Sequence, residues 1–142
     1  MRVRFLDSSV FLHAYLRPRR RLTPREAAVK EAARRVLVNV EAGEPVITTV
    51  VHVSEIANMV ESRVGLAESV GLVARLLSLD NVEVLEVSAR DYERALAVSQ
   101  RYAVSLNDAV AYLKMREKGV EEAYTFDKHF RSLPGVRVLP KL

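Results

Sequence analysis

The predicted order of strands and helices constrains the fold of this chain more than any other feature of its sequence. Short apolar runs typical of buried strands alternate with longer segments of helical periodicity, and no two strands are joined by a hairpin turn. Strands that are connected through helices pair in parallel, and a parallel sheet is covered by helices on both faces. We therefore expect an α/β fold with a parallel sheet.

The apolar pattern and the breaker residues give the bounds of these elements. Strands are expected at residues 3–6, 45–49, 82–87, 122–126 and 136–139. Helices are expected at residues 8–16, 24–42, 50–63, 91–102 and 105–118, with a short helical turn at residues 128–131. A stripe of Leu66, Val70, Val73 and Leu77 indicates one more helix after Gly65. Right-handed crossovers then place the carboxyl ends of the strands along one edge of the sheet.

Length and composition exclude several classes of protein. A chain of 142 residues is expected to form a single domain over residues 1–142. The lack of cysteine excludes disulfides, thiolate zinc sites and cysteine nucleophiles. The net charge of +4 suits a polyanionic partner, although many soluble proteins are mildly basic. No signal-peptide layout and no membrane-spanning apolar run is present, so we expect a cytoplasmic location without membrane contact.

Four carboxylates stand where strands end or helices begin. Asp7 and Asp127 follow the last apolar residues of strands, whereas Glu55 and Asp108 lie in the first turns of helices. Taken singly, the aspartates can be helix caps and the glutamate a solvated residue. Together at one sheet edge, four acids would repel one another unless a cation or shared protons compensate. Magnesium or manganese is the natural partner of such a set, because hard divalent ions take oxygen ligands.

Other catalytic patterns are missing from the sequence. His13, His52 and His129 lack the paired spacing of a zinc site, although His52 shares a helix flank with Glu55. There is no Walker loop, no GxGxxG motif and no GxSxG elbow. Ser9 occupies the place where a phosphatase of the haloacid dehalogenase type needs a second acid.

Four segments in this order resemble the PIN domain family, and most closely its VapC-type toxins. They are FLDSSVFL, TTVVHVSEIANMV, SLNDAVAYLKMREKGV and AYTFDKHF, and they extend over essentially the whole chain. The resemblance implies a three-layer α/β/α sandwich with a central parallel sheet and an endoribonuclease that depends on Mg²⁺ or Mn²⁺. It also implies a homodimer and an antitoxin partner that covers the active site, expected to dock a helix in an apolar groove near the acids.

The resemblance assigns roles to individual residues. The catalytic and metal-binding acids would be Asp7, Glu55, Asp108 and Asp127, and the supporting hydroxyls would be Ser9 and Thr125. Many family members carry another acid shortly after the position of Asp127, but here Lys128 and His129 follow, which puts a second metal ion in doubt. Asn107 is interpreted as a residue of the helix start rather than as a group supporting the site.

Two alternatives to a toxin stay open at this point. One is a PIN nuclease that processes RNA without acting as a toxin, and the other is a catalytically silent module that binds protein or RNA. The intact set of acids argues against a silent module, because such a module has no need for carboxylates that repel one another.

The segment RPRRRLTPR at residues 17–25 contains two prolines and is expected to be an exposed basic connection. A charge run of this kind is usually a solvated surface. Its Arg19, Arg20 and Arg21 are nevertheless candidates for contacts with RNA, because guanidinium groups bind phosphates in paired geometry.

Overall fold

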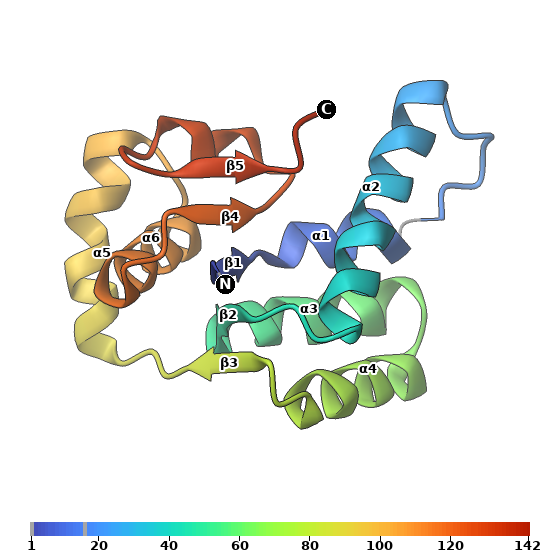
Figure 1. The fold of residues 1–142 in the computed structure, drawn as a ribbon, viewed down its shortest axis with the longest axis horizontal. Helices are drawn as coiled ribbons and strands as arrows, with labels where there is room; N and C mark the ends of the chain where they lie inside the picture. Colours follow the sequence, from blue (N-terminus) through green and yellow to red (C-terminus); the bar gives the residue numbers. More distant parts are fainter. Residues whose placement is uncertain (1, 16) are drawn as a thin grey trace.

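The computed structural model describes residues 2–15 and 17–142, and its centre is a parallel five-stranded sheet (Figure 1). The strands are β1 (Arg4–Leu6), β2 (Val46–Thr49), β3 (Val82–Leu85), β4 (Glu122–Tyr124) and β5 (Arg137–Leu139). Their order in the sheet is β3-β2-β1-β4-β5, and every neighbouring pair is parallel. The chain therefore first adds β2 and β3 on one side of β1, and later adds β4 and β5 on the other side. The carboxyl ends of β1 and β4 meet at this reversal, where open parallel sheets commonly bind ligands.

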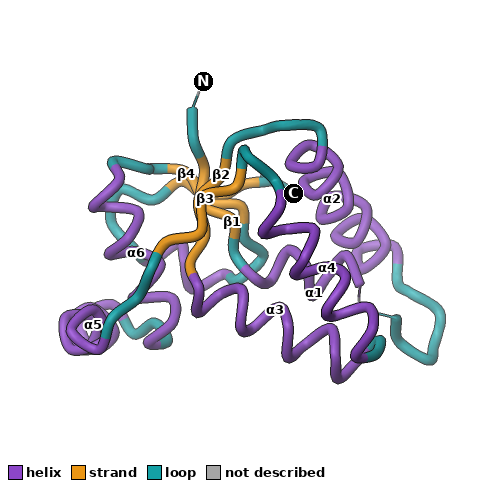
Figure 2. The backbone as a smooth tube through the Cα atoms, turned by 90° about the horizontal axis from the view of Figure 1, so that it is seen from below, coloured by secondary structure: helices purple, strands orange, loops and turns teal. Residues whose placement is uncertain are grey.

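Helices cover both faces of the sheet and complete the expected three-layer sandwich (Figure 2). On one face lie α1 (Ser8–Tyr15), α2 (Pro24–Glu41), α3 (Val50–Arg63) and α4 (Leu66–Ser78). On the other lie α5 (Ala89–Tyr102) and α6 (Leu106–Lys118), with the short 3₁₀ helix η1 (Lys128–Ser132) between β4 and β5. The predicted end of the first helix at Leu16 lies outside the described residues.

The alternation of side chains on β1 divides the core into two halves. Phe5 packs with the residues of α5 and α6, whereas Leu6 packs on the opposite face against α1, α2 and α3. Both side chains are buried, so the position of the next residue, Asp7, is fixed by packing on both faces of the sheet.

Two strands end earlier than the sequence predicts, and side chains form hydrogen bonds with the backbone N–H groups that follow them. After β4, Ser9 Oγ accepts from Phe126 N at 2.9 Å and Thr125 Oγ1 accepts from Asp127 N at 3.0 Å. After β3, a capping box between Ser88 and Asp91 starts α5 at Ala89, not at residue 91. Residues 86–87 and 125–126 are not strand residues in the structure.

The predicted stripe does lie on a helix, but it faces away from the core. In α4, Leu66, Val70 and Leu77 are 64%, 61% and 59% exposed, whereas Ser69 and Leu76 are buried.

Within the described part of the chain, no helix is long and apolar enough to span a bilayer.

Candidate metal centre

The carboxylate of Asp7 is buried at the end of β1, where the residue is only 4% exposed. Its Oδ2 accepts hydrogen bonds from Ser9 Oγ at 2.6 Å and from Thr125 Oγ1 at 2.8 Å. Its bond from the Ser9 backbone N is long, at 3.4 Å, so capping of α1 is a minor role. Among the described residues Oδ1 has no hydrogen-bond donor, which leaves this oxygen free for a ligand.

Glu55 lies one turn into α3 and is held from two directions. Its Oε1 accepts from Ser8 Oγ at 2.8 Å, and its Oε2 accepts from Asn107 Nδ2, also at 2.8 Å. The Asn107 oxygen in turn accepts from the Tyr92 hydroxyl at 2.7 Å. The interpretation of Asn107 as only a helix-start residue is therefore wrong, because its side chain orients Glu55 from α6.

Asp108 and Asp127 form a second carboxyl pair beside Asp7. Asp108 is buried at the start of α6, and its pKa is raised to about 8 by burial, by the charge and hydrogen bond of Asp127, and by the charge of Asp7. Asp127 is partly exposed and caps η1, accepting from His129 N at 2.9 Å, while His129 Nδ1 lies 3.0 Å from the same oxygen. One oxygen of Asp127 is thus engaged by His129.

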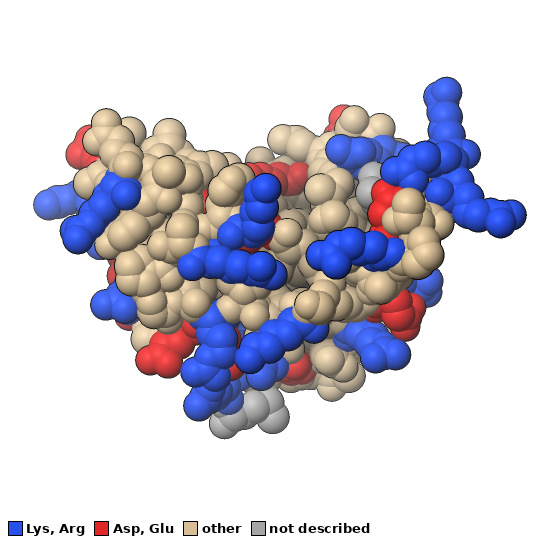
Figure 3. Space-filling model, turned by 90° about the horizontal axis from the view of Figure 1, so that it is seen from above, with Lys and Arg blue, Asp and Glu red and all other residues tan. Residues whose placement is uncertain are grey.

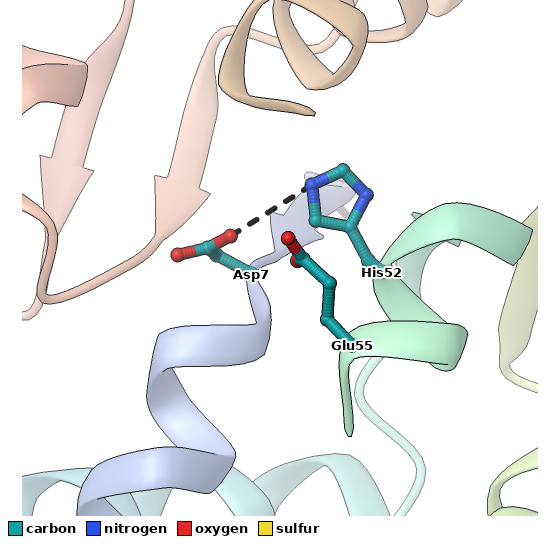
Figure 4. A group of neighbouring side chains, drawn as sticks. All are labelled: Asp7, His52 and Glu55. Atoms are coloured by element: carbon teal, nitrogen blue, oxygen red, sulfur yellow. Dashed lines mark ion pairs between the residues drawn. The ribbon is translucent and has the colours of Figure 1, made fainter. Parts of the chain in front are cut away.

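His52 is the residue that the sequence interpretation missed. It is fully buried, and its Nε2 lies 3.9 Å from Asp7 Oδ1 (Figure 4). Burial lowers the pKa of its imidazole more than the charges of Asp7 and Glu55 raise it, so the ring is neutral at pH 7. The available signal was its spacing, because a residue three positions before Glu55 on a helix lies on the same side.

The chemistry of these groups fits a divalent cation. Asp7, His52 and Glu55 each offer one atom within 4.8 Å of the others, and the nearby Asp108 is disfavoured as an anion unless positive charge is added. Carboxylate oxygens are the ligands that Mg²⁺ and Mn²⁺ prefer. Asp108 and Asp127 lie beside this group of three and are not part of it among the described residues.

Comparison with known proteins shows the family to which the chain belongs. Residues 4–136 match the family model of the PIN domain. The chain belongs to the PIN domain family. The toxin VapC20 of Mycobacterium tuberculosis, which cleaves the sarcin–ricin loop, has a similar structure, with a TM-score of 0.72, 29% identity, and coverage of 97% of this chain and 99% of VapC20. No curated protein matches the chain significantly.

Two more distant structures share this PIN fold. A toxin–antitoxin complex from Klebsiella pneumoniae contains a chain with a TM-score of 0.62 and 16% identity, with 96% of each chain covered. The protein PAE2754 of Pyrobaculum aerophilum has a TM-score of 0.55 and 14% identity, covering 97% of this chain and 89% of that protein. The predicted fold and family are thus confirmed.

The raised pKa of Asp108 predicts how the stability of the metal-free protein depends on pH. Between the ordinary value of 3.8 and about 8, the folded chain keeps a proton that the unfolded chain releases, so stability falls as pH rises. Asp108→Asn should remove this decrease in stability with pH, because asparagine does not titrate. With a chelator present, the variant should melt higher than wild type, by several degrees at pH 8 and much less at pH 4.5.

Thermal unfolding monitored by circular dichroism measures this difference. Asp80→Asn, which changes an exposed aspartate before β3, serves as the matched control and should show no such trend. A melting difference for Asp108→Asn that is equal at both pH values would contradict the assignment.

Proposed function

We propose that the protein is a metal-dependent endoribonuclease that acts as the toxin of a toxin–antitoxin pair. The observation that carries the proposal is the gathering of Asp7, Glu55, Asp108 and Asp127 at one sheet edge, with two of them oriented by neighbouring hydroxyl and amide groups. Membership of the PIN family, which includes nucleases, and the 29% identity to a ribonuclease toxin support it. RNA as substrate implies a cytoplasmic location.

Asp7 and Glu55 would hold the ion, with Asp108 and Asp127 completing its surroundings. Bound there, Mg²⁺ or Mn²⁺ would supply a Lewis acid for a phosphate oxygen and a water of lowered pKa. The protein orients both carboxylates by hydrogen bonds before an ion binds. Hydroxyl bonds to Oδ2 of Asp7 leave Oδ1 directed into the site, and bonds from Ser8 and Asn107 fix the carboxylate of Glu55.

No side chain of the site has the arrangement of a covalent nucleophile. The hydroxyls of Ser9 and Thr125 both donate to Asp7, and each accepts from a backbone N–H, so neither is placed to attack phosphorus. Water is therefore the proposed nucleophile. A silent binding module remains disfavoured, because burying Asp7 and Asp108 among other acids lowers stability, and a bound cation would offset this cost.

An antitoxin is the proposed protein partner. A groove of about 680 Å³ runs between the end of α1 and α2, with Tyr15, Leu37 and Val38 in its lining and Arg17 and Arg34 also contributing. Such a groove fits a helix with an apolar face and acidic flanks. It begins at the end of α1 opposite Asp7, so an antitoxin seated here would need a further segment to reach the acids.

The basic connection before α2 is the proposed contact for the RNA backbone. Arg19, Arg20 and Arg21 are exposed, and on the face seen in Figure 3 lysine and arginine side chains predominate over acidic ones. The guanidinium of Arg20 makes two hydrogen bonds of 2.7 Å to Glu26, which also belongs to the capping box of α2. Arg19 and Arg21 are therefore expected to contribute more to RNA binding than Arg20.

A second copy of the chain is proposed to cover the exposed face of α4. This face carries Leu66, Val70 and Leu77, with no charged residue among them over about three turns. Antiparallel packing across a two-fold axis would place Leu66 of one copy against Leu77 of the other and Val70 against Val73. The face is thus self-complementary, as a symmetric dimer requires.

Asp7→Asn tests the proposed nuclease site. The amide can still accept both hydroxyl bonds, so the fold should survive, but the ligand charge is lost. Cleavage of a structured RNA in Mg²⁺ or Mn²⁺ should fall more than about a hundredfold, because even groups behind a metal ligand are worth 10- to 100-fold. Gel assays of the purified variant measure this loss, with Asp80→Asn as the matched control. Full cleavage by a folded Asp7→Asn protein would sink the proposed site.

The salt dependence of RNA binding tests the basic connection. In an Asp7→Asn background, replacing Arg19 and Arg21 with alanine should reduce the slope of log affinity against log salt by about two, roughly one for each lost phosphate contact. The control replaces Arg90 and Arg101 of α5, which are also exposed. An unchanged slope with Arg19 and Arg21 replaced would assign the segment to solvent or to the protein partner.

Val70→Glu tests the proposed dimer. A charge at the centre of the apolar face should convert the dimer to a monomer at micromolar concentration, because a pair of buried like charges is strongly unfavourable. Size exclusion with light scattering measures the mass. Leu96→Glu, at a 53% exposed position on α5, should remain dimeric. A monomeric wild type, or a Val70→Glu protein that stays dimeric, would exclude this interface.

A further inference from the structure

The position of the His52 ring is determined by two contacts. The ring packs edge-on against Phe5, with centroids 5.0 Å apart and planes at 82°. Its Nδ1 lies 2.7 Å from Thr49 Oγ1, and the same oxygen caps α3 by accepting from Val51 N and His52 N. The Nδ1 side of the imidazole is therefore held by the N-cap residue of its own helix, and only Nε2 is available to the site.

That other nitrogen is buried without a hydrogen-bond partner. Nε2 of His52 has no donor or acceptor in bonding distance among the described residues. The nearest carboxylate oxygen, Asp7 Oδ1, is 3.9 Å away, which is too far for a hydrogen bond. A buried polar atom left unpaired costs free energy, so a folded protein normally supplies it with a partner.

The direction of Nε2 identifies the kind of partner. Figure 4 shows this nitrogen on the same side as the carboxylates of Asp7 and Glu55, and the three ligand atoms lie within 4.8 Å of one another. Either atom can be the donor in the 2.7 Å contact between Nδ1 and Thr49 Oγ1. Binding of a metal ion through Nε2 requires the tautomer with its proton on Nδ1, and for that tautomer Thr49 Oγ1 lies in place as the acceptor. A ligating histidine is usually oriented in this way by a partner on its other nitrogen.

We propose that His52 is a nitrogen ligand of the metal centre and gives it a preference for Mn²⁺ and similar transition-metal ions over Mg²⁺. The inference rests on the proposed function, because it concerns the ion of that site. Mg²⁺ takes oxygen ligands and retains its waters, whereas imidazole suits first-row transition metals. A site of two carboxylates and one imidazole therefore differs more in its affinities for Mn²⁺ and Mg²⁺ than a site made only of carboxylates.

The test measures metal binding and does not depend on RNA cleavage. Mn²⁺ is titrated into the metal-free protein, bound ion is followed by the loss of the free-ion electron paramagnetic resonance signal, and Mg²⁺ is added as a competitor. The wild-type protein should bind Mn²⁺ with a much higher affinity than Mg²⁺. His52→Asn, which keeps an amide near Thr49 but has no atom at the place of Nε2, should lose about tenfold in Mn²⁺ affinity with little change for Mg²⁺.

Pulsed resonance of the bound Mn²⁺ reports the ligand directly. Wild type should show coupling to a ¹⁴N nucleus, and the coupling should be lost in His52→Asn and in His52→Gln. The wild-type spectrum alone decides the question if a variant fails to fold. Bound Mn²⁺ that requires Asp7 but shows no ¹⁴N coupling would overturn the role of His52 and leave the proposed nuclease intact. Absence of any divalent-ion binding, together with absence of RNA cleavage, would instead overturn the proposed function.

Discussion

The two hydroxyl bonds to Oδ2 of Asp7 are the interaction on which the rest of the site depends. Ser9 and Thr125 donate to the same carboxylate oxygen, and each accepts from a backbone N–H of the segment after β4. One buried carboxylate thus links the end of β1, the first turn of α1 and the chain that leads to Asp127. Since bonds to a charged acceptor are stronger than neutral ones, this network also makes the burial of Asp7 tolerable.

The remaining acids reach the same place from different elements, and their charges conflict. Glu55 comes from α3 and accepts hydrogen bonds from Ser8 and Asn107. Asp108 comes from α6, and its pKa is raised by burial and by the neighbouring Asp127 and Asp7. Repulsion of this kind is typical of functional sites, where it lowers the stability of the fold until a ligand binds.

Much of this arrangement could be predicted from the sequence, because it follows from strand order. A parallel sheet brings residues after β1 and β4 to one edge, so the neighbourhood of Asp7 and Asp127 required only the positions of the strands. The pairing of Asn107 with Glu55 and the unpaired nitrogen of His52 could not be predicted in this way. They depend on how α6 and α3 are rotated about their axes, which packing decides.

Helix faces show the same limit. The stripe of Leu66 and Leu77 correctly indicated α4, yet the helix buries Ser69 and Leu76 instead. On α5, Leu96 is 53% exposed, whereas the small Ala95 beside it is buried. Periodicity identifies an amphipathic helix, but it does not tell an apolar face that packs on the sheet from one left for another molecule.

We propose that the acids direct hydrolysis of RNA by water with the help of a divalent ion. The most direct measurement is to incubate the purified protein with structured RNAs in Mg²⁺, in Mn²⁺ or in a chelator, and to determine the chemistry of the product ends. If water is the nucleophile, cleavage requires an ion, the product ends carry linear phosphates, and cleavage continues when the 2′-hydroxyl at the cut position is replaced by hydrogen. Products with 2′,3′-cyclic phosphate, or cleavage that persists in the chelator, would contradict it.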